Sequence, residues 1–256
     1  MFLEPNHTPY DLRWRMFGTD VRVHPLFWLV SAVLGWSAFS GPGGNVGYLA
    51  LWVACSFVSI LLHEFGHIWM GRLFGADGHI VLFSFGGLAV GSNQLSRRWQ
   101  RMAVSFAGPA AQLVLWAVLW LLAFRLGMLQ RLPEAWFGPV SRAWEMLYVI
   151  NLYWPLLNLL PIWPLDGGQI SRDLLEGVLG SRGTSLALGI SLVVAGLLAA
   201  HSLMNHLGQQ FLPTWVPAGG LYSALLFAWL AAGSYMTLQA ESEKRRYWDD
   251  DPPWGR

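Results

Sequence analysis

The stretch Leu61-Leu62-His63-Glu64-Phe65-Gly66-His67-Ile68-Trp69 places two histidines and one carboxylate inside a long apolar run. His63 and His67 are four residues apart, so a helix carries both on one face, one turn apart. This spacing allows the two imidazoles to bind one Zn²⁺, while Glu64 beside them can act on the attacking water. The stretch therefore predicts a zinc site on a helix.

The composition indicates that this helix lies in a membrane. The 256 residues are 54% hydrophobic and only 12% charged, whereas soluble domains carry about 25% charged residues. An ionisable cluster is costly within an apolar membrane segment, so its default interpretation is functional. The net charge of +1 gives no indication of a nucleic-acid partner. The single cysteine, Cys55, excludes an internal disulfide and a cysteine-based zinc site.

Six apolar stretches predict six membrane-spanning helices, at about 25–40, 47–74, 102–124, 140–160, 184–203 and 218–239. Residues 79–91 are β-branched and aromatic with glycines around them, which predicts a β-hairpin, and a further short strand or interfacial segment is expected at 17–24. The expected fold is an all-α membrane bundle of six helices, with a short membrane-associated β-hairpin after the second helix. Residues 1–256 are expected to form one membrane-embedded domain, with the six-span core at 25–239.

The positive charges predict the orientation of this bundle. With both termini in the cytoplasm, 13 arginines and lysines fall on the inner side and only three, Arg125, Arg131 and Arg142, on the outer side. This bias follows the positive-inside rule. We therefore expect a multi-pass protein of the cell membrane with residues 1–24 and the charged tail 240–256 in the cytoplasm.

Two histidines do not complete a catalytic zinc site, which takes three protein ligands and an open position for water. The other histidines form no second paired motif, so a carboxylate is favoured as the third ligand. Asp166 follows Pro161 and Pro164 and precedes two glycines, and irregular backbone at membrane depth is tolerated beside a wet cavity or inside protein. The predicted topology brings it to the same membrane side as the histidines. Asp173, on an amphipathic stretch at 169–180, is the reserve candidate, and a turn-forming role for Asp166 stays open.

These residues resemble the site-2 protease family of intramembrane zinc proteases, peptidase family M50. The resemblance rests on His63-Glu64-Phe65-Gly66-His67 and on the downstream segment from Asn158 to Gly168, NLLPIWPLDGG. Phe85-Gly86-Gly87 and Ala107-Gly108-Pro109 also match family segments. The similarity covers most of residues 20–180 in the expected order, without the PDZ or CBS domain of many members. The third span departs from the family pattern at Gln112, where asparagine is common.

The resemblance implies the chemistry of the site. His63, His67 and Asp166 would bind one Zn²⁺ per chain, and Glu64 would be the catalytic base. Apart from the resemblance, the expected mechanism needs a partner for the scissile carbonyl, and Asn158 would hydrogen-bond it, although a structural role near Pro161 is equally open. Phe85, Gly86 and Gly87, in the hairpin, would meet the substrate as an added strand. The expected function is an intramembrane zinc endopeptidase that acts on single-span membrane proteins within the lipid bilayer.

Two other classes of function remain to be weighed. A divalent-metal transporter would need further polar ligands along a path through the other spans, and the spans at 25–40, 102–124, 184–203 and 218–239 contain almost none. A catalytically inactive homologue that binds membrane proteins would be expected to lack some of the chemical residues, and here all are present. The sequence does not indicate the oligomeric state, the substrate or the cleavage site.

Overall fold

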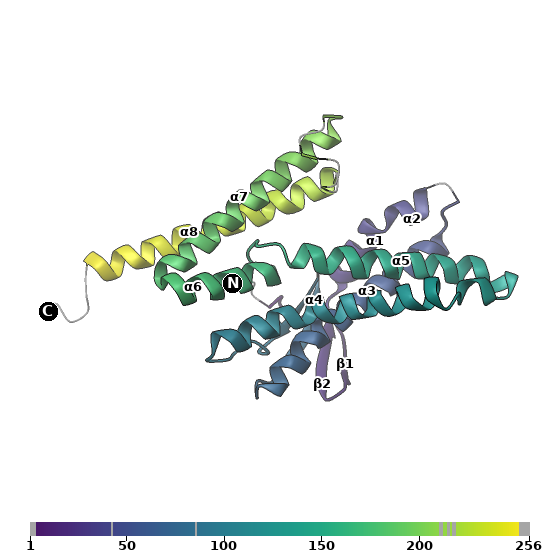
Figure 1. Cartoon of the computed structure of the whole chain (residues 1–256), viewed down its shortest axis with the longest axis horizontal. Helices are drawn as coiled ribbons and strands as arrows, with labels where there is room; N and C mark the ends of the chain where they lie inside the picture. Colours follow the sequence, from purple (N-terminus) through teal and green to yellow (C-terminus); the bar gives the residue numbers. More distant parts are fainter. Residues whose placement is uncertain are drawn as a thin grey trace. The chain divides into compact units, whose positions relative to one another are not determined.

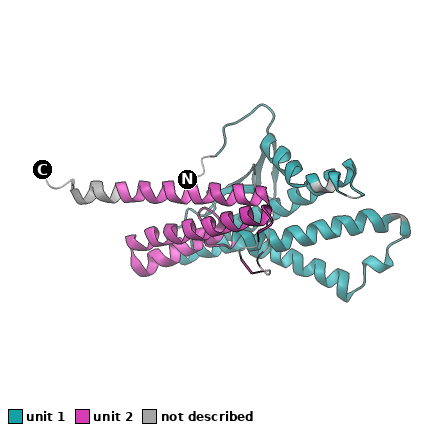
Figure 2. Ribbon diagram, turned by 90° about the horizontal axis from the view of Figure 1, so that it is seen from above, with its two compact units in different colours: residues 1–158 teal, residues 159–256 magenta. Residues whose placement is uncertain are grey.

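The computed structural model describes residues 4–41, 43–84, 86–209, 212–213, 216 and 219–250, without the side chains of residues 37, 38, 135 and 244–250. The chain divides into two compact units, Met1–Asn158 and Leu159–Arg256, coloured separately in Figure 2. The first unit contains a small sheet and a helix bundle. The second contains helices only, within the part of the chain that is described.

The sheet of the first unit has four strands in the order β1-β2-β3-β4. They are β1 (Leu12–Met16), β2 (Thr19–Val23), β3 (His79–Phe83) and β4 (Gly86–Val90). The β3–β4 pair is the hairpin that the sequence predicts, and β2 matches the short strand expected at 17–24. The parallel pairing of β2 with β3, in which Val21 faces Ile80, joins an N-terminal hairpin to it. This pairing leaves β4 at one edge of the sheet.

The helices of the first unit are arranged around α3 (Val46–Leu73), as Figure 1 shows. Those that pack against it are α1 (Pro25–Leu34), α2 (Trp36–Ser40), α4 (Arg98–Trp120) and α5 (Glu134–Asn158). A π-helical turn, Leu121–Arg125, continues α4, and a 3₁₀ turn, Leu129–Arg131, precedes α5. Asn45 begins α3 by accepting a hydrogen bond from the Tyr48 backbone N–H at 2.9 Å, which satisfies one of the free donors of the first turn.

One face of the sheet packs on α3 and forms the core of the first unit. Val21 and Val23 of β2 and Ile80 and Leu82 of β3 lie on this face, because alternate residues of a strand share a side. Their partners on α3 are Ile60, Leu61, Phe65 and Ile68. Through the register Leu82↔Gly87 and Ile80↔Ala89, Gly87 and Ala89 of β4 lie on the same face. The sheet is thereby aligned with the turns of α3 that carry the two histidines.

The last turn of α3 also holds the N-terminal hairpin. The Arg72 guanidinium donates to the carbonyl oxygens of Phe17 and Gly18, each at 2.8 Å. These two residues form the β1–β2 turn with positive φ angles of 49° and 72°, the geometry of the two-residue turn that suits a hairpin. The Phe17 ring packs edge-on against Phe65 at 5.6 Å between centroids. Arg72 is one of the 13 positive charges expected on the inner side of the membrane. It also holds the β1–β2 turn to the end of α3.

The second unit consists of a proline-rich segment and the helices α6 (Asp166–Leu179), α7 (Ser181–His206) and α8 (Leu221–Asp250). Both long helices hold the segment. The Trp163 backbone N–H donates to Ser191 Oγ of α7 at 2.9 Å, and Ser234 Oγ of α8 donates to the Trp163 carbonyl at 3.3 Å. Glycine is needed at 167 and 168, because a Cβ atom at either position would collide with the backbone of residues 159–163. These contacts fix the position at which α6 begins with Asp166.

Four helical segments are long and apolar enough to cross a membrane within the described residues: Val46–Leu73, Arg98–Arg125, Ser181–His206 and Leu221–Glu243. They coincide with four of the six predicted spans. The predicted span at 25–40 forms the short apolar α1 followed by α2. The predicted span at 140–160 forms α5, whose charged Arg142 and Glu145 lower its hydropathy. The fold is therefore mostly helical with four candidate spans and a small sheet.

Candidate metal centre

His63 and His67 lie on one buried face of α3. His63 and His67 are only 3% and 7% exposed, and their ring centroids lie 4.8 Å apart. His67 Nδ1 lies 2.7 Å from the backbone carbonyl oxygen of Val104 on α4. A carbonyl oxygen can only accept, so Nδ1 carries the hydrogen and Nε2 of the neutral ring keeps its lone pair. A ring held in this way is the usual arrangement of a metal-binding histidine.

Close contact between α3 and α4 creates this arrangement. A Cβ atom at Gly66 would collide with the backbone of Ala107 and Gly108, and a Cβ atom at Gly108 would collide with the His67 and His63 rings. Small residues let helices approach closely in membranes. The segment Ala107-Gly108-Pro109, which the sequence suggests is a packing element, therefore also shapes the metal centre.

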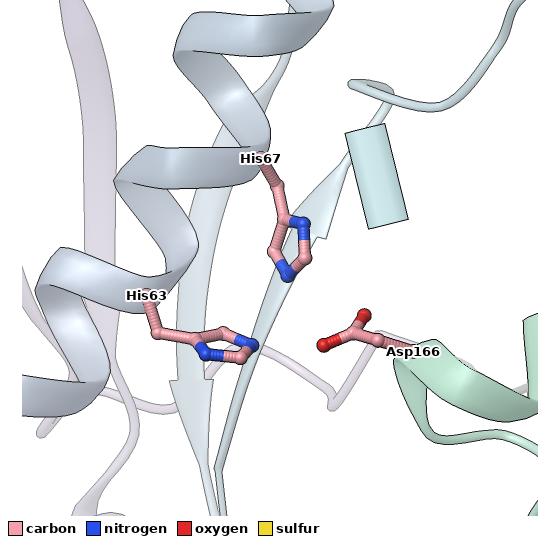
Figure 3. Close-up of side chains that lie close together, drawn as sticks. All are labelled: His63, His67 and Asp166. Carbon is pink, nitrogen blue, oxygen red and sulfur yellow. The ribbon is translucent and has the colours of Figure 1, made fainter. Parts of the chain in front are cut away.

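Asp166, the first residue of α6 and 7% exposed, offers a carboxylate oxygen as the third candidate ligand. The ligand atoms of His63, His67 and Asp166 all lie within 4.8 Å of one another, and the three could hold a metal ion. Figure 3 shows the two imidazoles and the carboxylate directed toward a common point. Asp173, the reserve candidate, does not belong to this group in the described part of the chain.

The donor set fits zinc. Two imidazole nitrogens and one carboxylate oxygen are the ligands of a catalytic zinc site, which keeps its fourth position for water or substrate. Both Nδ1 atoms are engaged elsewhere, so each histidine can offer Nε2 alone. Asp166 lies in the first turn of α6, where a negative charge is favoured by the helix dipole. These residues together can therefore bind a divalent cation of the zinc type.

Glu64 lies beside the histidines and under strand β4. It is 4% exposed, and a Cβ atom at Gly87 would collide with its carboxylate. A Cβ atom at Gly86 would instead lie 3.7 Å from the Trp154 ring, which is an ordinary contact. Edge strand β4 therefore passes directly over Glu64 at a position where a side chain would not fit. Phe85, the third hairpin residue of the predicted substrate site, lies outside the described residues.

Asn158 is the last residue of α5, and its amide Nδ2 donates to the Trp154 carbonyl one turn earlier at 3.0 Å. This contact lies within α5 and not at the backbone near Pro161, and the catalytic role of Asn158 stays a prediction. Gln112 has a clearer place than the sequence indicates. It is fully buried on α4, and its Oε1 atom lies 2.9 Å from His63 Nδ1. Its only signal in the sequence is the departure from the family's asparagine.

An apolar cavity of about 290 Å³ lies elsewhere in the first unit. Its lining comes mainly from α1, α3 and α5, with Ser84 of the β3–β4 turn, and includes Phe27, Trp52 and Tyr153. None of the three candidate ligands lines it. The metal centre is therefore a separate, largely buried site.

The chain is similar to known proteins over the segment that carries this centre. The chain matches peptidase family M50 over residues 52–136 and 126–200, a range that contains all three candidate ligands. The chain belongs to this family. Rip3 of Mycobacterium tuberculosis is 31% identical over 91% of the chain and 58% of its own length. The zinc metalloprotease MJ0392 of Methanocaldococcus jannaschii is 27% identical over 77% of the chain and 56% of its own length.

The family fold extends over most of the chain. The solved site-2 protease from Methanocaldococcus jannaschii superimposes with a TM-score of 0.57 at 22% identity, and the match covers 89% of this chain and 94% of that one. By contrast, the chain spans about half the length of the curated M50 relatives that it matches. The resemblance to the site-2 protease fold is thus confirmed.

Proposed function

We propose that this chain is an intramembrane zinc endopeptidase of the site-2 type, a single membrane-embedded domain that hydrolyses peptide bonds of single-span membrane proteins. The observation that carries the proposal is the juxtaposition of His63, His67 and Asp166, with Glu64 buried beside them. Membership of family M50 and the names of the zinc metalloprotease relatives support it.

His63, His67 and Asp166 would hold one Zn²⁺ per chain. Bound zinc lowers the pKa of water toward about 7 and polarises a carbonyl oxygen. The ligands keep one position open, because three protein groups leave a tetrahedral site incomplete. The burial of all three ligands limits bulk water around the site, which strengthens electrostatic interactions there.

Glu64 would act as general base and then as general acid. It follows His63 directly on α3, so its carboxylate is held beside the metal centre by the same helix turn. In the first step it accepts the proton of the attacking water, and in the second it passes that proton to the leaving amine. Asn158 is the proposed donor to the developing oxyanion: one N–H of its amide donates to the Trp154 carbonyl, and the second N–H would donate to substrate.

Strand β4 would present the substrate to this base. It is the edge of the sheet, so its free side can accept an extended peptide as a fifth strand. A helical substrate must unwind first, because its carbonyl groups are paired within the helix. Gly87 faces Glu64 without a side chain between them, which would allow the backbone of the bound strand to lie close to the reacting groups. Phe85 and Gly86 would complete this binding segment.

The proposal includes six membrane crossings. Apolarity does not identify two of them, the crossing by α1 and α2 and the crossing by α5, and contacts in the first unit support both. Strand β2 precedes α3 and β3 follows it, yet the two strands pair, so the segment 24–45 has to return along the length of α3. In α5, Ala143 lies near Cys55 and Asn151 near Ser59. Therefore α5 runs in the same direction as α3. With both termini in the cytoplasm, the metal centre would lie toward the cytoplasmic end of α3.

The test is the isosteric substitution Glu64→Gln. Glutamine has nearly the same shape as glutamate but cannot act as a base. We therefore expect the variant to retain zinc and to lose proteolytic activity. Membranes from cells that carry the wild type or the variant would be compared by quantitative proteomics for single-span proteins that accumulate uncut. Each trapped protein would then be offered to purified wild-type enzyme in liposomes, with the new terminus sequenced.

The expected result is one or more proteins cut within or next to their span by wild type and left intact by Glu64→Gln. Glu241→Gln, in the cytoplasmic end of α8, serves as a matched control that should cut normally. Full cleavage by Glu64→Gln would refute the proposed mechanism.

A further inference from the structure

Three buried polar side chains lead from α5 through α3 and α4 to His63. Asn151, Ser59 and Gln112 are each 0% exposed, although they lie among helices whose other contacts are largely apolar. Asn151 Nδ2 donates to Ser59 Oγ at 2.8 Å, Gln112 Nε2 donates to the Ser59 backbone carbonyl at 3.2 Å, and Gln112 Oε1 lies 2.9 Å from His63 Nδ1. Buried polar groups of this kind are costly unless they are satisfied, and in this set both donor groups and the Gln112 oxygen have partners, whereas Asn151 Oδ1 has none.

The direction of both Gln112 bonds follows from the Ser59 carbonyl, which can only accept. The Ser59 carbonyl only accepts, so the Gln112 atom that faces it must be the NH₂ group. The amide oxygen of Gln112 must then face His63, and it also only accepts. His63 Nδ1 is therefore the protonated nitrogen, and Nε2 is the one with the free lone pair. The tautomer of His63 is set by a backbone carbonyl of its own helix, through Gln112.

The same carbonyl also belongs to the helical ladder at His63. In an α-helix the N–H of residue 63 bonds to the C=O of residue 59, so Gln112 contacts His63 at its ring and at its backbone acceptor. Asn151 adds a bond to the Ser59 hydroxyl and another to the Leu147 carbonyl, at 2.8 Å each. Three helices thus converge on the turn that orients one imidazole.

We propose that Gln112 is a positioning residue that fixes the tautomer and orientation of His63 for metal binding, with Ser59 and Asn151 holding it in place. The proposal rests on the function proposed above only for the identity of the metal. It assigns the two histidines different kinds of support. His67 is held by a backbone carbonyl, which no substitution removes. His63 is held by the side chain of Gln112. The zinc affinity of the site therefore depends on residue 112.

The experiment compares two substitutions of similar size. Gln112→Met fills the same volume but removes the acceptor, and we expect zinc affinity to fall by about 10- to 100-fold, the range for outer-shell partners of metal ligands. Gln112→Glu keeps an acceptor oxygen toward His63, and its buried carboxyl in the neutral form can still donate an O–H to the Ser59 carbonyl, so we expect it to bind zinc within a few-fold of wild type. Competition with a zinc chelator, on purified full chain in detergent, measures both affinities.

A second measurement reads the tautomer directly. Nitrogen-15 spectra of histidine-labelled, metal-free protein should show His63 with the hydrogen on Nδ1 in wild type and in Gln112→Glu, and a loss of that preference in Gln112→Met. Equal zinc affinity in both variants, or a wild-type His63 with its hydrogen on Nε2, would overturn the proposal. Neither readout involves proteolysis, so a failure of the proposed protease activity would leave this result separate and interpretable.

Discussion

At the residue scale, the close approach of Gly87 to Glu64 gives the sharpest steric prediction. The substitution Gly87→Ala would place a methyl group against the Glu64 carboxylate, so the base would have to shift. A misplacement of about 1 Å at a reacting group can cost about 100-fold in rate. We therefore expect proteolysis to fall by about that factor, while zinc content stays at the wild-type level. The measurement is the initial cleavage rate in liposomes.

The neighbouring glycine provides the control for this experiment. A Cβ atom at Gly86 makes only an ordinary contact with Trp154, so Gly86→Ala, in the same proposed binding segment, should lose far less activity than Gly87→Ala. Equal losses in the two variants would mean that strand flexibility, rather than the space above Glu64, decides the effect.

The residues of the metal centre differ in how far the sequence predicts them. His63, Glu64 and His67 follow from helical spacing in an apolar run, because that pattern determines their relative positions. Asp166 required an argument from topology, and the contact distances agree with that choice. The role of Gln112 could not be predicted, because it depends on a rotamer that reaches from one helix to two groups on another.

At the scale of elements, the N-terminal segment is tied to the sheet by a charged cluster. Thr8 Oγ1 donates to Asp11 Oδ1 at 2.6 Å, and the Arg22 guanidinium donates to Asp11 Oδ2 at 3.1 Å. Together these bonds hold the pKa of the Asp11 carboxyl well below its usual range, and the hydrogen bond from the Thr8 side chain contributes most. Because Arg22 belongs to β2 and is itself buried, the cluster ties residues 4–11 to the sheet.

This cluster predicts a pH-dependent stability difference. A carboxyl whose pKa is lower in the folded state stabilises the fold above the unfolded pKa of about 3.9, and this contribution is lost as the pH falls toward the folded value. The melting temperature of Asp11→Asn should therefore be lower than that of wild type at pH 7, and this difference should shrink progressively below about pH 4. Asp20→Asn, at an exposed carboxylate, should show little difference at any pH. A gap between wild type and Asp11→Asn that does not change with pH would contradict the assignment.

The elements themselves were largely predictable, and the exceptions have physical causes. The hairpin at β3–β4 followed from its glycines and β-branched residues, because these are local signals. The parallel pairing of β2 with β3 joins residues almost 60 positions apart in the chain, and no local pattern reports such a contact. The N-terminal residues were therefore expected to form a short strand or interfacial segment, and not part of a four-stranded sheet.

At the scale of the whole molecule, apolarity identifies four candidate spans within the described residues, two fewer than the six that the sequence predicts. The sequence predicts six because it weighs stretches of moderate hydropathy together with the distribution of charge. The hydropathy of α5 is lowered by its polar residues, which include Asn151, whose Nδ2 donates to Ser59 and Leu147 inside the first unit. Buried polar contacts of this kind are visible only in a structure.

The six-span topology predicts a pattern of labelling. Single cysteines at Tyr10, Gly44, Gln130 and Ser181, in a Cys55→Ala background, would be treated with a membrane-impermeant maleimide on intact cells. Positions 44 and 130 should be labelled at once, and positions 10 and 181 only after permeabilisation. Labelling of residue 10 in intact cells would remove the crossing by α1 and α2, and labelling of residue 181 would remove the crossing by α5.

The most direct test of the central claim is X-ray absorption at the zinc edge of the purified chain. We expect one zinc per chain, with two imidazole ligands from His63 and His67, one carboxylate from Asp166 and no sulfur. Asp166→Ala should lose an oxygen ligand and bind zinc far more weakly, while Asp173→Ala should leave the spectrum unchanged. A zinc environment that is the same in wild type and Asp166→Ala would contradict the site on which the proposed function depends.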